Sequence, residues 1–181
     1  KFNTMICFIL PIACAFTLVA PKAGGQIPVV KDARVISFEE NKVPDNWKGA
    51  GLAINTAHYK DGKQSMQWTF KPGETISLKK DVMFQKKDPT GKDLYLSTFT
   101  GWFYNTKAIN DSIRVGFYKE GKECCHFNLR TAFTGWRAAW VCFERDMQGT
   151  PQEGMDEVRF TAPKSSEGQI CIDLMIPSVK T

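Results

Sequence analysis

The stretch Phe133–Met147, FTGWRAAWVCFERDM, decides the class of fold. It opens with Thr134–Gly135, a pair typical of a turn, and continues with aromatic residues that alternate with small ones. Successive side chains of a β-strand point to opposite faces, so an alternation of this kind is typical of a strand. The stretch therefore predicts a turn followed by a β-strand, with its charged residues at the strand's end.

The rest of the chain repeats this pattern of short strands and turns. Met66, Trp68 and Phe70 alternate with polar residues, and turn signals such as Asp61–Gly62 separate one run from the next. Loops are expected at residues 40–49 and 79–93. Strands are expected at residues 34–39, 51–56, 65–70, 75–78, 94–104, 113–118, 124–130, 133–144, 155–161 and 169–176.

This series of strands predicts an all-β fold. No stretch keeps an apolar period of 3.6 residues long enough for a substantial helix, and no internal repeat is present. A doubly wound α/β fold is not expected, because parallel strands need crossover connections that are usually helical. The pattern indicates an antiparallel sandwich or barrel, and the number of strands favours a jelly-roll β-sandwich.

The first part of the chain has the features of a secretory leader. Lys1 precedes an apolar run over residues 5–20, which Pro11 interrupts and which is shorter than the roughly 20 residues of a membrane span. We therefore expect a signal peptide at residues 1–25 and one β-sandwich domain at residues 27–181. The 181 residues of the chain are enough for one domain with a sizeable core.

The leader predicts a secreted or periplasmic protein without a membrane span. A lipoprotein with its lipid on Cys14 is the less favoured alternative, because the apolar run continues to Ala20. Loss of Lys1 and Lys22 with the leader lowers the formal charge from +5 to +3. So small a surplus identifies no polyanion, and no Lys/Arg cluster is dense enough to predict a nucleic-acid partner.

The cysteines that remain after the leader lie in apolar, strand-like runs: Cys124, Cys125, Cys142 and Cys171. Buried free thiols are expected, and a disulfide of undetermined pairing is the alternative. His126 follows two of these cysteines, but adjacent strand residues point to opposite faces and zinc is not predicted. The chain has no nucleophile elbow, phosphate loop or His-Glu-x-x-His motif.

The tryptophans allow two interpretations. Trp102, Trp136 and Trp140 could stack on sugar rings, but the alternation favours Trp68, Trp136 and Trp140 as core residues between the sheets. Trp47 lies in a polar stretch and is the best candidate for an exposed ring. The carboxylates of Glu144 and Asp146 are expected to be solvated.

Five blocks of the sequence resemble, in order, the N-terminal domain of chondroitin sulfate ABC lyases. The resemblance covers roughly Val35 to Ser178 and is carried by residues 59–68, 98–111, 133–147, 155–163 and 168–173. In that family the domain is implied to be a jelly-roll sandwich similar to carbohydrate-binding modules. A helical toroid follows it and carries the Tyr, His, Arg and Glu groups for β-elimination. The resemblance implies a bacterial polysaccharide lyase as the parent protein, with no catalytic residue in this domain.

Two carboxylates suggest a cation site. Glu39 is expected in the first strand and Asp173 in the last, and these strands can lie close together in a jelly roll. Carbonyl groups of the turn at residues 59–62 could complete an oxygen cage. The resemblance implies a structural Ca²⁺ or Na⁺ held by main-chain carbonyls of Ser37, Tyr59 and Gly62, by the Asp173 carboxylate, and by the carbonyl or side chain of Glu39.

Three functions follow from the sequence and the resemblance. The first is a non-catalytic accessory domain that positions chondroitin or dermatan sulfate for a downstream catalytic domain of the same parent chain. The alternative is a structural module that packs on the catalytic domain without touching glycan. A stand-alone enzyme is the least favoured, for want of recognisable catalytic residues.

Overall fold

The computed structural model describes residues 34–181, and the leader expected at residues 1–25 lies outside them. The described part of the chain runs through eleven strands and one short helix. Their bounds are β1 Trp47–Lys48, β2 Leu52–Asn55, β3 Ser65–Phe70, β4 Thr75–Lys79, β5 Ser97–Asn105, β6 Ser112–Lys119, β7 Lys122–Arg130, β8 Gly135–Cys142, α1 Phe143–Asp146, β9 Gln148–Gly149, β10 Glu157–Thr161 and β11 Gly168–Lys180.

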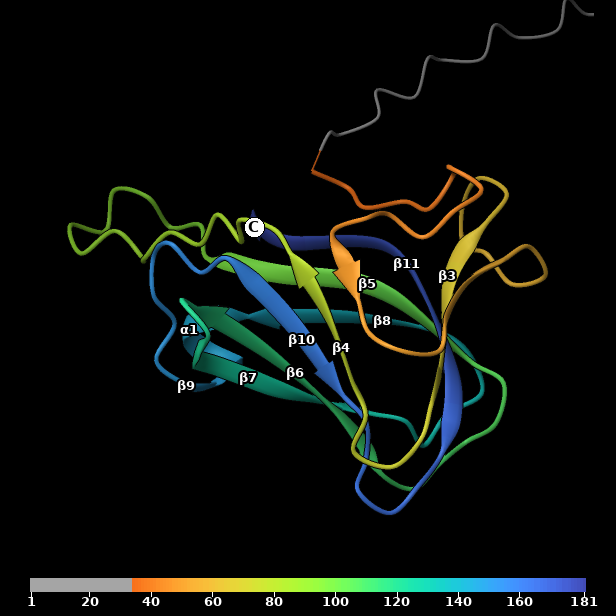
Figure 1. The fold of residues 1–181 in the computed structure, drawn as a ribbon. Coiled ribbons are helices and arrows are strands. Elements are labelled where there is room, and N and C mark those ends of the chain that lie inside the picture. Colours follow the sequence, from red (N-terminus) through yellow and green to blue (C-terminus); the bar gives the residue numbers. More distant parts are fainter. Residues whose placement is uncertain (1–33) are drawn as a thin grey trace, which may run out of the picture. The chain divides into compact units, whose positions relative to one another are not determined.

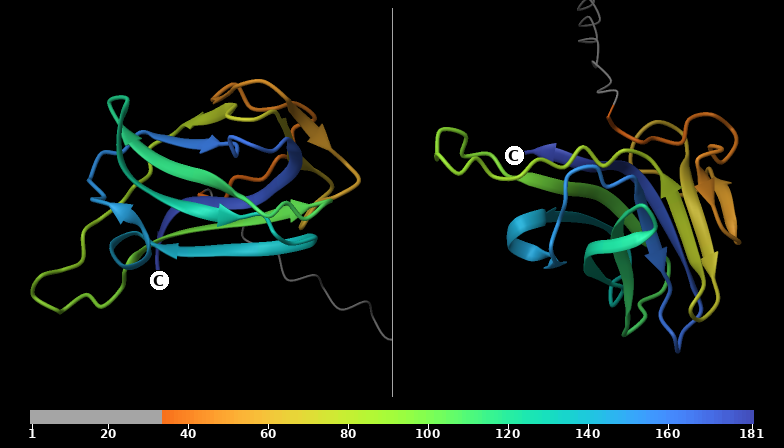
Figure 2. Two further views of the ribbon diagram at one scale, coloured as in Figure 1. Left: turned by 90° about the horizontal axis from the view of Figure 1, so that it is seen from below. Right: turned by 60° about the vertical axis from the view of Figure 1, so that its left-hand side comes forward.

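The strands form two antiparallel sheets that pack face to face (Figure 1). One sheet has six strands in the order β1-β4-β10-β6-β7-β9, and the other has five in the order β2-β3-β11-β5-β8. Figure 2 shows the two layers from other sides, with β11 running along the sandwich between β3 and β5. The antiparallel β-sandwich predicted from the sequence is confirmed. No helix in the described range is long and apolar enough to cross a membrane.

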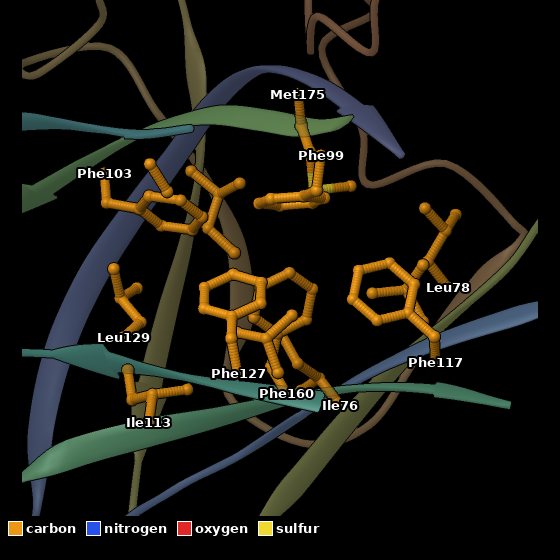
Figure 3. Close-up of a cluster of buried hydrophobic side chains, with 14 of the residues drawn as sticks. Ile76, Leu78, Phe99, Phe103, Ile113, Phe117, Phe127, Leu129, Phe160 and Met175 are labelled. Atoms are coloured by element: carbon orange, nitrogen blue, oxygen red, sulfur yellow. The ribbon is translucent and has the colours of Figure 1, made fainter. Parts of the chain in front are cut away.

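The core lies between the sheets and is rich in phenylalanine (Figure 3). The ring of Phe99 in β5 lies 5.7 Å from the ring of Phe117 in β6 and 5.2 Å from that of Phe127 in β7. The ring of Phe103, four residues after Phe99 and on the same strand face, packs 6.3 Å from the ring of Phe160 in β10. These contacts join the two sheets, and such aromatic burial dominates the energy of a core.

Two expectations about the first part of the domain are wrong. Residues 34–39 form no strand, and only Ile36 makes an isolated bridge, with Met175. Trp47 is buried, because β1 pairs with β4 and its ring packs 6.0 Å from Phe160 and 5.9 Å from Phe38. The polar residues around Trp47 predicted a loop at residues 40–49. Most of this range is a loop, but Trp47 and Lys48 form a two-residue edge strand within it.

The expected positions of the tryptophans are partly wrong. Trp68 is fully buried, as predicted, but Trp140 is 63% exposed and Trp136 is only half-buried. In the pairing of β8 with β5, Trp136 lies opposite Tyr104 and Trp140 opposite Thr100. This register directs both indoles away from the core, and Ala139 faces inward instead. An alternating strand predicts two faces, but it does not tell which face is buried.

The four cysteines are free thiols, and three of them are buried. Burial raises the pKa of the Cys125 thiol to about 12, so this sulfur stays protonated and unreactive at neutral pH. The imidazole of His126 lies 3.0 Å from Arg114 Nη2 and 3.0 Å from Gln148 Oε1. Both ring nitrogens are therefore engaged with neighbouring side chains.

The positions of the tryptophans generate a stability prediction. Trp68→Ala should lower the free energy of unfolding by about 3–5 kcal/mol, because it leaves a large cavity between the sheets. Trp140→Ala should change it by less than about 0.5 kcal/mol, because the exposed indole fills no core space. Denaturant unfolding of the two variants measures the difference. Equal losses would contradict the described register of β8.

Candidate functional site

The outer face of the five-stranded sheet carries a row of ring side chains. Along β5 these side chains alternate with the buried Phe99 and Phe103, so they point away from the core. Tyr104 lies opposite Trp136 of β8, and their ring centroids are 5.3 Å apart. The imidazole of His58 stacks on Tyr104 at 4.1 Å with an interplanar angle of 17°. We call Trp136, Tyr104 and His58 the aromatic row.

Amide side chains continue this face on the neighbouring strands. Gln67 Oε1 accepts hydrogen bonds from Asn55 Nδ2 at 2.7 Å and from Gln169 Nε2 at 2.9 Å. Gln67 Nε2 also donates to the Thr69 hydroxyl at 3.3 Å. We call Asn55, Gln67 and Gln169 the amide row. The mutual bonds hold the three amides in place, and each keeps further donors or acceptors for a ligand.

The pairing register places the two rows side by side. Cys171 of β11 lies opposite Tyr104 on one side and opposite Gln67 on the other. A line across the sheet therefore runs from Trp136 through Tyr104 and Cys171 to Gln67. Neighbouring strands are about 4.8 Å apart, so the line from β8 to β3 is about 14 Å long. The outer face thus presents ring faces at one end and hydrogen-bonding groups at the other.

The segment between β2 and β3 fixes His58 on this face. The side chain of Asn55 accepts the N–H groups of Ala57 at 2.9 Å and of His58 at 2.7 Å, which closes a turn. The Ser65 hydroxyl donates to the His58 carbonyl at 2.6 Å. Further along the segment, the Lys60 ammonium lies 4.0 Å from the centre of the Trp102 ring. The Trp102 ring is therefore covered by Lys60, whereas Trp136 is not.

The structure brings the two predicted carboxylates, of Glu39 and Asp173, to one turn. Lys60 N–H donates to Asp173 Oδ2 at 2.8 Å, and Lys63 N–H donates to the Glu39 carboxylate at 3.1 and 3.2 Å. Gly62 has a φ of 72° and lies directly against the Glu39 carboxylate, where a Cβ would clash. The two carboxylates therefore reach the same turn from residue 39 and from β11.

The remaining predicted residues flank these two carboxylates. Tyr59 directly precedes Lys60 in the turn. Ser37 follows Ile36, whose main chain pairs with Met175 two residues beyond Asp173. One turn thus contacts Glu39 and Asp173, and the bridge of Ile36 to Met175 lies nearby, although residues 34–39 form no regular strand. The ligand set of five residues stays a prediction.

Asp173 has the environment of a carboxylate that lacks charge compensation. It is fully buried, and none of the ion pairs described among residues 34–181 involves it. Burial raises the pKa of its carboxyl group above the ordinary value, three main-chain N–H groups oppose this shift, and the nearby Glu39 carboxylate adds to it. The next residue, Leu174, takes a left-handed φ of 46° where β11 shifts its register against β5.

This donor set fits a hard cation. Two carboxylates at one turn offer oxygen ligands of the kind that Ca²⁺ and Na⁺ take, and a cation would offset the unpaired buried charge. We propose that Asp173 and Glu39, with carbonyl groups of Ser37, Tyr59 and Gly62, hold a structural Ca²⁺ or Na⁺. When bound, the ion would fix the turn that carries Lys60 and so the outer face beside it.

The sequence indicated some residues of the outer face but misplaced them. Trp136 was expected in the core, and Tyr104 and Gln67 were not singled out at all. One signal was available for Gln67 and Tyr104. In β3 and β5 every second residue is buried, and the polar or aromatic residues between them, which include these two, face outward. His58 carried no such signal, because its place depends on the turn formed by Asn55.

Comparisons with known proteins identify the family. The family model described as "Lyase, N terminal" matches residues 32–181. The chain belongs to this lyase N-terminal family. A chondroitin sulfate ABC exolyase of Bacteroides thetaiotaomicron is 51% identical over 154 residues, which are 84% of this chain and 15% of the relative. One from Proteus vulgaris is 36% identical over 128 residues, 71% of this chain and 12% of the relative.

These matches confirm the resemblance to the N-terminal domain of chondroitin sulfate ABC lyases. The chain spans only a small part of the length of those relatives. The lyase N-terminal domain also resembles solved structures. An exo-β-agarase structure has a TM-score of 0.56 at 6% identity, covering 81% of this chain and 25% of that one. The CBM22-1 xylan-binding domain of Paenibacillus barcinonensis has a TM-score of 0.50 at 14% identity, covering 78% and 89%. At such identities the likeness shows a shared sandwich fold alone.

The cluster around Asp173 generates a prediction about stability and cations. Asp173→Asn should lower the free energy of unfolding by about 1–3 kcal/mol, because an amide nitrogen replaces an oxygen that accepts main-chain N–H groups. Added Ca²⁺ or Na⁺ should raise the melting temperature of the unsubstituted domain but not of the variant. Glu153→Gln removes an exposed carboxylate elsewhere and should keep the full response. An Asp173→Asn domain that still responds to both ions would remove Asp173 from the site.

Proposed function

We propose that this lyase N-terminal domain is a non-catalytic glycan-binding domain that holds chondroitin or dermatan sulfate for a catalytic domain of the same parent protein. The observation that carries the proposal is the line of rings and amides across the outer face of the five-stranded sheet. Both relatives are named as chondroitin sulfate ABC exolyases and are much longer than this chain. The proposal therefore assigns β-elimination to another part of the parent, which we place outside the cytoplasm of a bacterium.

The chemistry of the outer face suits a sugar chain. A pyranose ring has an apolar face of C–H groups that can lie on an aromatic ring, and its hydroxyl groups need hydrogen-bonding partners in a binding site. Trp136 offers a ring, supported by Tyr104 on which His58 stacks, and Gln67 and Gln169 offer both donors and acceptors. Because each of these side chains stands on a strand, the arrangement exists before a ligand arrives and loses little entropy on binding.

A separate observation favours the structural alternative, in which this domain packs on the catalytic domain. The loop between β4 and β5 extends from the sandwich beside the C-terminal end of β11 (Figure 1). Several of its apolar residues are exposed. Leu94 is 77% exposed, and Met83 and Tyr95 are each 65% exposed. Exposed apolar residues that gather on one segment often mark a protein contact.

The loop is held firmly by its own polar groups. The Asp88 carboxylate accepts the N–H groups of Thr90, Lys92 and Asp93 at 2.8, 3.1 and 3.0 Å. Leu96 and Thr181 exchange two main-chain hydrogen bonds of 3.0 Å, and Lys180 pairs with Asp93. The exposed side chains are thus presented on a segment that is held against the C-terminal end of β11. We propose the adjoining catalytic domain of the parent as their partner, a contact compatible with glycan on the outer face.

The glycan proposal predicts the effect of removing one ring. Trp136→Ala should weaken binding of the domain to chondroitin sulfate at least about tenfold, a loss of about 1.4 kcal/mol. Trp136→Phe should keep much of the affinity, because a ring remains. Tyr95→Ala, which removes an exposed ring outside this face, is the matched control and should bind as the unsubstituted domain does.

Titration calorimetry at low and high salt measures these affinities. Contacts to a polyanion are strongest at low salt, so the absence of binding there would reject the function. Equal binding by Trp136→Ala and the unsubstituted domain would place the glycan elsewhere.

The docking proposal makes a prediction about the parent protein. Leu94→Ser together with Tyr95→Ser should speed limited proteolysis after Thr181 several-fold, because the contact between the domains is weakened. In the isolated domain the same changes should alter the free energy of unfolding by less than about 0.5 kcal/mol. An unchanged cleavage rate in the parent would contradict the assigned contact.

A further inference from the structure

A groove opens at the end of the outer face where β3 and β5 finish and β11 begins. Its volume is about 760 Å³, within the usual range for sites that bind small molecules. Its lining includes Thr69 and Phe70 of β3, Lys71 directly after it, Lys107 after β5, and Gly168 and Gln169 of β11. We call this space the edge groove.

The edge groove continues the amide row. Gln169 lines the groove and donates to Gln67 at 2.9 Å, and Thr69 lines it and accepts from Gln67 at 3.3 Å. A ligand that lies along the amide row therefore reaches the groove without crossing an intervening strand. The groove is thus an extension of the same face and not a separate cavity.

Close packing at Gly168 maintains the wall of the groove. A Cβ atom at Gly168 would lie 2.5 Å from Ile109 Cδ1 and 2.7 Å from Phe70 Cζ, so only glycine lets these side chains close over the backbone. Both neighbours also line the groove, and Phe70 belongs to the core. The groove thus has a rigid apolar wall beside its polar groups.

Two lysines and two glutamates line the groove. Lys71 and Lys107 both line it, and within residues 34–181 no ion pair engages the ammonium group of either. Glu74 and Glu167 also line the groove, and Glu74 accepts the Lys71 N–H at 2.9 Å. Carboxylates can accept sugar hydroxyl groups, whereas an ammonium group that no carboxylate of the domain engages is available to pair with an anion of a ligand.

The other sheet provides a contrast. On the outer face of the six-stranded sheet, Lys79 and Arg159 both pair with Glu157, at 2.6 and 2.7 Å, and Arg114 pairs with Glu123 at 2.6 Å. These three basic groups are therefore already matched by carboxylates of the domain. The two lysines of the edge groove are not matched in this way, although they lie next to the proposed glycan path.

We propose that the edge groove binds a sugar unit that carries an anionic substituent, with Lys71 and Lys107 as the groups that recognise it. The proposal rests on the glycan-binding function above and extends it to a second position on the same chain. The anionic group can be a uronic acid carboxylate or a sulfate ester, because both offer oxygen atoms to an ammonium group.

The proposal is tested with a double variant, Lys71→Gln and Lys107→Gln, which removes both charges and leaves a slightly shorter polar side chain at each position. Its affinity for chondroitin sulfate at low salt should fall about tenfold or more, and the dependence of binding on salt should become shallower. The control pair, Lys92→Gln and Lys122→Gln, causes the same loss of net charge away from the outer face and should stay within about twofold of the unsubstituted domain. Glu167→Gln should instead raise the affinity, because a like charge is removed.

The outcomes separate this proposal from the function on which it rests. If Trp136→Ala weakens binding but the Lys71 and Lys107 pair does not, the groove proposal is overturned and the function stands. If the unsubstituted domain binds no chondroitin sulfate, both fail. An equal loss for the test and control pairs would show general charge attraction and would also overturn the groove proposal.

A second ligand identifies the anion. Binding is repeated with chondroitin from which the sulfate groups have been removed. If the Lys71→Gln and Lys107→Gln variant still loses affinity for this ligand, the lysines recognise the carboxylate. If the loss of affinity disappears, they recognise the sulfate. Either result supports an anion in the groove. Thermal melting of each variant checks that the exposed substitutions leave the fold intact.

Discussion

The register of β5 between β8 and β11 is the constraint on which the rest of the domain depends. It directs Phe99 and Phe103 into the core, where they meet phenylalanines of the opposite sheet. The same register directs Tyr104 outward, opposite Trp136 and beside β11. A slip of one residue would exchange the two faces, so the buried phenylalanines fix the position of the aromatic row. The energy of the core thus determines the geometry of the proposed binding face.

The central strand β11 links three parts of the molecule. Its first residues form one wall of the edge groove, its middle supplies the buried Asp173, and its last residues support the loop with Leu94 and Tyr95. The irregular pairing after Asp173, with Leu174 in a left-handed conformation, interrupts an otherwise regular strand. Strain of this kind persists only where surrounding contacts enforce it, and here the Asp173 carboxylate binds the turn that carries Lys60.

The sequence predicted the class of fold and most strands, because alternating residues and turn pairs are local signals. The strand at residues 65–70 and the alternation of Met66, Trp68 and Phe70 needed no knowledge of distant parts of the chain. The sequence failed where the answer depends on pairing. Trp47 is buried by a two-residue strand against β4, and Trp136 faces outward because of its register with β5.

The residues of the candidate site also fall into those that the sequence indicated and those that only the structure revealed. Asp173 and Glu39 were found from their residue types together with the family resemblance, whereas His58 and Gln67 became recognisable only through contacts to Asn55 and Gln169. A single sequence gives no indication that these side chains share a face. The edge groove likewise forms only where the ends of β3 and β5 meet the start of β11. The sequence alone therefore does not show that its two lysines line the same groove.

The central claim is that glycan lies on the outer face of the five-stranded sheet. Titration of chondroitin sulfate oligosaccharides into the isotope-labelled domain, followed by NMR, tests this most directly. The account predicts that the largest shifts fall on the Trp136 indole N–H and on the side-chain amides of Gln67 and Gln169, with smaller shifts around Lys71 and Lys107. Shifts confined to the six-stranded sheet, around Arg114 and Arg159, would contradict it.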